Sequence, residues 1–159
     1  MSYDLMVFRK EAAPKTRTDF MKWYDDQTEW TEDHSYDDPV NTSIELRNWF
    51  MEMIHTFPAM NGPFASQDDD DLNVSDYSIG KDVIYVAFAW SLAEDAYKKM
   101  LELAEKHGVG FFDASGDDGD IFFPENGKLK LIGSSNNSNS LLNDNYSNEQ
   151  KNKTWWKFW

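Results

Sequence analysis

The chain contains 159 residues, of which 40% are apolar, with no cysteine and a formal net charge of −14. This length suits one domain with its own hydrophobic core, and the lack of cysteine excludes disulfides, thiolate nucleophiles and cysteine-ligated metals. Because nucleic-acid binding depends on Lys and Arg, the charge argues against a nucleic-acid partner and favours a basic protein, although net charge also simply maintains solubility.

The N-terminal stretch "YDLMVFRK" predicts a first strand. Leu5 and Val7 alternate with Met6 and Phe8, so both faces are apolar, which is typical of an interior strand. No basic segment followed by a long apolar run and a cleavage site begins the chain, and no 18 consecutive residues are apolar. We therefore expect a cytoplasmic protein that does not span a membrane.

Two helices are predicted next from the spacing of apolar residues. The first begins near residues 16–18 and ends at about Trp30, after apolar positions at helical intervals. The second opens with the capping-box spacing of Thr42 and Glu45, in which hydroxyl and carboxylate each bind a free backbone N–H. It carries a broad apolar stripe up to residue 57 and stops at Pro58.

The second half of the chain predicts a hairpin, a third helix and a second hairpin. Ser91 and Glu94 repeat the capping box, and Gly108 follows the helix as its C-terminal cap. The expected strands are "DYSIG" and "DVIYVAFAW", joined through Gly80 and Lys81, then "GVGFFDAS", "GDIFFP" and a short edge strand "KLKLI". This order predicts an α+β fold of the ferredoxin-like split β-α-β type, with an antiparallel sheet and helices on one face.

The charge and composition divide the chain into three predicted parts. Residues 1–132 form the α+β domain and carry a net charge of −15, whereas the remainder carries +1. Residues 133–153 are rich in Asn and Ser and predict a flexible tether. Residues 154–159 form an aromatic tail that we expect to dock on an apolar surface through Trp155, Trp156, Phe158 and Trp159. The docking surface is the chain's own domain, a membrane interface or another protein.

Few residues suggest catalysis or metal binding. In "DASGDDGD", Asp113, Ser115 and Asp117 alternate like the first ligands of a calcium loop. The glycine, however, comes one place late, and Pro124 occupies the closing position, where a calcium loop has a glutamate. A hairpin turn explains this stretch better than a metal site does. The three histidines are widely spaced, and no phosphate loop or nucleophile motif occurs. We therefore expect a non-enzymatic protein without a cofactor.

Aromatic side chains interleaved with carboxylates predict a surface for a basic partner. Flat rings provide contact area at a small entropic cost, and acidic groups steer the approach of a basic protein. The competing interpretation is that these rings are core residues. The predicted partner-binding residues are Trp23, Asp25, Asp26, Glu29, Trp30, Glu32, Asp33, Tyr36, Asp37, Asp38, Asp68, Asp69, Asp70 and Asp71.

Five stretches carry a resemblance to known proteins: "MSYDLMVF", "FMKWYDDQTEW", "WFMEMIHTFPAMNGP", "DYSIGKDVIYVAFAW" and "AEKHGVGFFDASG". Over residues 1–124 the chain resembles a family of small acidic bacterial proteins. In size and charge these are similar to the immunity proteins encoded beside polymorphic toxins. The resemblance implies a binding protein that neutralises a basic toxin by surface contact. The alternative that the sequence leaves open is an adaptor at a membrane or a protein surface, anchored by its Trp-rich tail.

Overall fold

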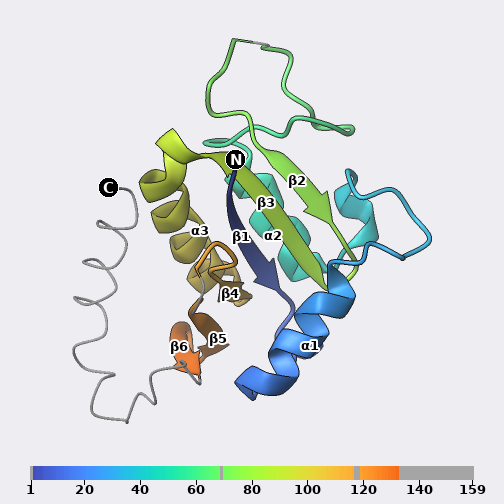
Figure 1. Cartoon of the computed structure of the whole chain (residues 1–159). Helices are drawn as coiled ribbons and strands as arrows, with labels where there is room; N and C mark the ends of the chain where they lie inside the picture. The colour runs from blue at the N-terminus through green and yellow to red at the C-terminus, as the bar shows by residue number, and fades with distance from the viewer. Residues whose placement is uncertain (1, 69, 117–118, 133–159) are drawn as a thin grey trace.

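A computed structural model describes residues 2–68, 70–116 and 119–132 of the chain (Figure 1). The predicted Asn/Ser-rich tether and the aromatic tail lie outside these residues. In chain order, the elements are β1 (Ser2–Phe8), α1 (Arg17–Gln27), η1 (Pro39–Asn41), α2 (Ile44–Met53), β2 (Asp76–Ile79), β3 (Val83–Ala89), η2 (Trp90–Leu92), α3 (Ala93–His107), β4 (Gly110–Phe112), β5 (Ile121–Glu125) and β6 (Lys128–Ile132).

The strands form one antiparallel sheet with the order β2-β3-β1-β4-β5-β6. The prediction of an α+β fold is confirmed, as are the two hairpins and the central position of β1 and β3. Tyr3, Leu5, Met6, Val7 and Phe8 are all buried, because β1 has neighbours on both sides and packed side chains on both faces.

The helices cover both faces of the sheet, so the prediction that they share one face is wrong. Leu5 and Val7 pack in a core with α2 and α3. Met6 and Phe8 point the other way and form a second core with Phe20 of α1. The cause is the apolar character of both faces of β1, which requires a cover on each side. Figure 1 shows α2 behind β1 and β3.

Helix α1 begins at Arg17, within the predicted range, but the starts of α2 and α3 are displaced along the chain. The hydroxyl of Ser43, not that of Thr42, accepts from the backbone N–H of Leu46 at 3.4 Å and caps α2. Thr42 is buried and donates to the carbonyl of Lys81 at 3.1 Å. Where a capping box was predicted at Ser91, η2 precedes α3, and α3 has no side-chain cap at its start.

The helix ends also differ from the predicted ones, except at Gly108. This glycine adopts a left-handed φ of 67° after α3, as predicted for a C-terminal cap. Helix α2 ends at Met53, before the predicted stop at Pro58, and α1 ends at Gln27. Trp30 lies beyond α1 with a φ of 54°, a conformation that is unusual for a bulky side chain.

Candidate partner-binding surface

The predicted acidic residues lie in two segments near the two ends of β2. The first comprises the end of α1 and residues 28–38. We call residues 28–38 the acidic loop. The second is the segment 68–71, which precedes β2 in the chain. Asp25, Asp26, Glu29 and Asp33 are exposed in the first segment, whereas Glu32, Asp37 and Asp38 are half-buried. Asp68 and Asp70 are exposed in the second, Asp71 is half-buried, and Asp69 lies outside the described residues.

Several of these carboxylates stabilise turns. Asp38 accepts from the N–H of Val40 at 3.0 Å and caps η1. Asp68 accepts from the N–H of Asp70 at 3.0 Å. Such local contacts are the ordinary use of Asp in turns, so these two side chains have structural roles alongside the predicted contact with a partner.

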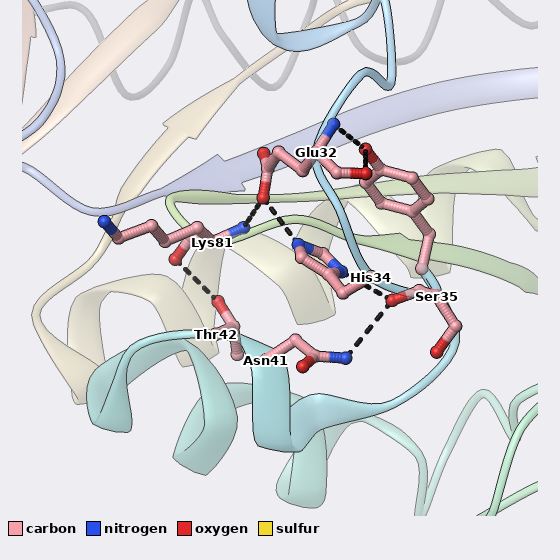
Figure 2. A network of polar contacts seen from close by, with 7 residues as sticks. Glu32, His34, Ser35, Asn41, Thr42 and Lys81 are labelled. Carbon is pink, nitrogen blue, oxygen red and sulfur yellow. Dashed lines mark hydrogen bonds and ion pairs between the residues drawn. The ribbon is translucent and has the colours of Figure 1, made fainter.

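Glu32 fixes the acidic loop to the β2–β3 turn (Figure 2). Its Oε1 accepts from the backbone N–H of Lys81 at 2.9 Å and lies 2.6 Å from Nε2 of His34. The hydroxyl of Thr42 donates to the carbonyl of the same Lys81. At the other side of the loop, the carbonyl of Tyr36 accepts from the N–H of Ile79 at 2.7 Å. The loop is therefore attached to the hairpin by hydrogen bonds at Glu32 and at Tyr36.

His34 has a hydrogen-bond acceptor at each ring nitrogen. Its Nδ1 lies 2.6 Å from the carbonyl of Ser35, and its Nε2 faces Glu32 (Figure 2). A neutral imidazole has one N–H, so only the imidazolium can donate to both acceptors. The hydrogen bond to Ser35 and then that to Glu32 raise the pKa of His34. In this arrangement the ring offers no lone pair to a substrate proton or a metal.

A hollow of about 460 Å³ opens beside this network. Gln27 of α1 and Asn41 of η1 contribute to its wall, which is otherwise charged. Residues of the acidic loop and of the β2–β3 turn complete the lining: Glu32, Asp33, His34, Lys81 and Asp82. Sequence reasoning missed this site, because its two sides lie almost fifty residues apart in the chain and no local spacing links them.

The three predicted aromatic anchors are half-buried, and each packs against a neighbouring aromatic ring. Trp23 packs edge-on against Phe8, with ring centroids 5.9 Å apart. Trp30 packs edge-on against Tyr36 at 5.1 Å and Tyr85 at 6.1 Å. Trp23 and Trp30 both belong to the margin of the second core. A partner would reach the exposed parts of these rings, while their buried parts hold the loop in place.

Two of the candidate calcium ligands, Asp113 and Ser115, make contacts within the fold. Asp113 is fully buried, and its backbone N–H donates to the carbonyl of Asp120 at 3.1 Å. The hydroxyl of Ser115 accepts from the N–H of Asp4. Asp117 lies outside the described residues, as do the tail residues Trp155, Trp156, Phe158 and Trp159. Among the residues that the structure describes, no group of three or more His, Asp or Glu side chains is arranged to hold a metal.

His34 provides a pH-dependent test of the network. Because its folded pKa is raised, its contribution is complete below the unfolded value of about 6.5 and is lost as the pH rises through the folded pKa. We expect His34→Gln to lower the free energy of unfolding by about 1 kcal/mol at pH 6, and by less as the pH rises. Urea unfolding between pH 5.5 and 9 measures this, with His55→Gln, at an exposed histidine, as the reference. A cost that does not change with pH would contradict the double-donor geometry.

Comparisons with protein-family models, with curated proteins and with solved structures find no match for this chain. Within the described residues, no helix combines the length and the apolar character needed to cross a membrane.

Proposed function

We propose that this protein is a non-enzymatic binding protein that recognises a basic protein partner through the acidic loop and the end of α1. The observation that carries the proposal is the fixed position of this acidic surface. Asp25, Asp26, Glu29 and Asp33 are exposed, and the loop that follows α1 is hydrogen-bonded to the β2–β3 hairpin through the Glu32 side chain and the Tyr36 carbonyl. A preorganised surface loses less entropy on binding than a flexible one.

Electrostatic attraction would act mainly on the rate of association. A cluster of exposed carboxylates raises the local concentration of a basic protein and orients its approach. Contact with the exposed parts of Trp23, Trp30 and Tyr36 would then slow dissociation, because aromatic anchors contribute much of the affinity of many interfaces. The segment 68–71 adds negative charge before the start of β2.

The chemistry of the hollow supports binding more than catalysis. A general base needs an available lone pair, and both nitrogens of His34 face acceptors. Glu32 accepts two hydrogen bonds that maintain the fold of the loop. We therefore propose that the protein acts by contact, as an immunity protein does when it covers the active surface of a basic toxin.

We further propose that the elements β1, α2, β2, β3, α3 and β4 constitute a ferredoxin-like split β-α-β unit. The strand order β2-β3-β1-β4 and the common core of α2 and α3 support this assignment. In this scheme α1 and the β5–β6 hairpin are additions to the unit. The acidic surface would then belong to an insertion between the first strand and the first helix of the unit.

Charge neutralisation tests the proposed function. The partner to test is a basic protein sought among the products of the genes adjacent to the one that encodes this chain. We expect Asp25→Asn with Asp26→Asn to slow association at low salt by about tenfold, because exposed charges act chiefly on the association rate. The control is Glu102→Gln with Glu105→Gln, which removes two exposed carboxylates from α3 and keeps the total charge equal.

Association rates measured by surface plasmon resonance at several salt concentrations distinguish a specific role of the α1 carboxylates from a general effect of net charge. The proposal requires the α1 variant to associate more slowly than the α3 control and to depend less on salt. Equal rates for the two variants would mean that the net charge alone acts, and the end of α1 would then have no specific role.

A further inference from the structure

The outer edge of β2 has one residue whose backbone is not paired. In the register of β2 and β3, Tyr77 lies opposite Val86 and Ile79 lies opposite Ile84. The N–H of Gly80 donates to Val83 at 2.8 Å, which places Gly80, Ser78 and Asp76 in hydrogen-bonded pairs with β3, because such pairs alternate along an antiparallel ladder. The backbone groups of Tyr77 and Ile79 therefore point away from β3, toward the edge of the sheet.

The edge is covered on each side of Tyr77. On one side, Ser75 donates to the carbonyl of Pro58 at 2.8 Å, and its own carbonyl accepts from Met60 at 3.0 Å. On the other side, Ile79 donates to the carbonyl of Tyr36. Between these contacts, the N–H of Tyr77 has no acceptor among the residues that the structure describes. Covered edges are the rule in monomeric proteins, so a gap of one residue is a local exception.

A hollow of about 370 Å³, separate from the one beside His34, has Tyr77 in its lining. Its walls come from the acidic loop, from the loop that precedes β2 and from β2 itself: Tyr36, Asp37, Asn61, Gly62, Asp76, Tyr77 and Ser78. Two of these residues are carboxylates, and the charged groups that line the hollow are all negative. The hollow therefore combines an unpaired peptide unit with an environment that favours a cation.

The side chain of Tyr77 holds this peptide unit in place. The ring is buried and packs edge-on against Phe50 with centroids 5.0 Å apart. Its hydroxyl donates to the carbonyl of Phe57 at 2.7 Å. The N–H and C=O of Tyr77, which point away from β3, are thus positioned before a partner arrives.

We propose that a short extended segment of a basic partner pairs with Tyr77 as an added strand residue. The proposal rests on the proposed function and specifies how the partner is held. One residue of the segment donates its N–H to the Tyr77 carbonyl and accepts from the Tyr77 N–H, as in strand addition to a sheet edge. The residues before and after it project to the face that Asp76 and Ser78 share, where Lys or Arg meets Asp76 and Asp37.

The covered positions at Ser75 and Ile79 limit the pairing to a single residue. A longer strand would collide with the backbone that already occupies both sites. The segment is therefore a small part of the interface, and its role is to fix the register of the partner. Steering by the acidic loop and pairing at Tyr77 are separate contributions, so they can be tested separately.

The test uses NMR of the full chain with blocked tripeptides as probes. In the free protein, we expect the Tyr77 amide to exchange with solvent faster than the amides of Ser78 and Ile79, which are hydrogen-bonded. Acetyl-Lys-Val-Lys-amide at millimolar concentration should shift the Tyr77 amide resonance downfield and slow its exchange. The analogue with N-methylvaline, which lacks the central N–H, should bind about fivefold more weakly, as expected for one lost hydrogen bond. Acetyl-Glu-Val-Glu-amide should not bind.

Each outcome decides the proposal. Protection of Tyr77 by the lysine peptide, weakened by N-methylation and by Asp76→Asn, would support it. Three results would overturn it: a Tyr77 amide already as protected as that of Ile79, equal binding of the methylated peptide, or no binding of the lysine peptide. The proposed function would survive any of these if the Asp25 and Asp26 variant still slowed association with the basic partner. Loss of that effect with Tyr77 pairing intact would refute the steering role alone.

Discussion

Replacing Phe20 with alanine is expected to lower the free energy of unfolding by about 3–5 kcal/mol, the usual cost of removing a buried aromatic ring. Phe20 is fully buried and is the main side chain by which α1 packs on the sheet. Its ring lies 5.1 Å from that of Phe8, 5.2 Å from that of Phe112 and 5.5 Å from that of Trp23. Its removal leaves a cavity among large rings, which cannot collapse easily.

Urea or thermal unfolding monitored by tryptophan fluorescence measures this effect. Lys22→Ala provides the control, because it changes an exposed side chain two positions along the same helix and should cost less than about 0.5 kcal/mol. If Phe20→Ala cost no more than this control, α1 would not be packed on the second face of the sheet. The variant also serves the functional question, because loosening α1 should displace Asp25 and Asp26 and slow association with a basic partner.

The sequence predicts individual helices and strands well, but it gives little information on how they pack against one another. The apolar stripe of α2 and the alternation in β1 depend on local periodicity, which a single sequence displays directly. The displaced cap of α2 follows from two adjacent hydroxyls, Thr42 and Ser43, either of which can accept from the helix start. The structure uses Ser43, because Thr42 is bound to the distant carbonyl of Lys81. A competing long-range contact of this kind has no signature in the local pattern.

The second core also depends on packing that the local sequence pattern does not reveal. Met6 and Phe8 already indicated that both faces of β1 would be buried, but a strand between two apolar layers does not reveal which helix forms each layer. Helix α1 occupies the second face because Phe20 completes the cluster of Phe8 and Phe112. The acidic residues were found from composition alone. Their attachment to the hairpin through Glu32 was not, because the partner groups lie in the β2–β3 turn.

Glu32 provides the second large prediction, because its side chain joins the acidic loop to that turn. We expect Glu32→Ala to lower the free energy of unfolding by about 2 kcal/mol, since it removes charge-assisted hydrogen bonds from partly buried donors. The N–H of Lys81 and the Nε2 of His34 both lose their acceptor. Chemical denaturation near pH 6 gives the cost, and Glu29→Ala, which removes an exposed carboxylate from the same loop, should cost less than about 0.5 kcal/mol.

A local measurement separates this role of Glu32 from a general loss of charge. Without Glu32, the Lys81 amide should exchange faster with solvent, and the pKa of His34 should fall, because one of the two contacts that raise it is gone. The contact with Ser35 would remain, so part of the rise in the pKa should persist. NMR titration of the imidazole distinguishes these cases. If Glu32→Ala left the Lys81 amide and the His34 pKa unchanged, the acidic loop would be held by its aromatic packing and by the hydrogen bond from Ile79 to the Tyr36 carbonyl. The Glu32 contact would then contribute nothing to the fixed position of the acidic surface.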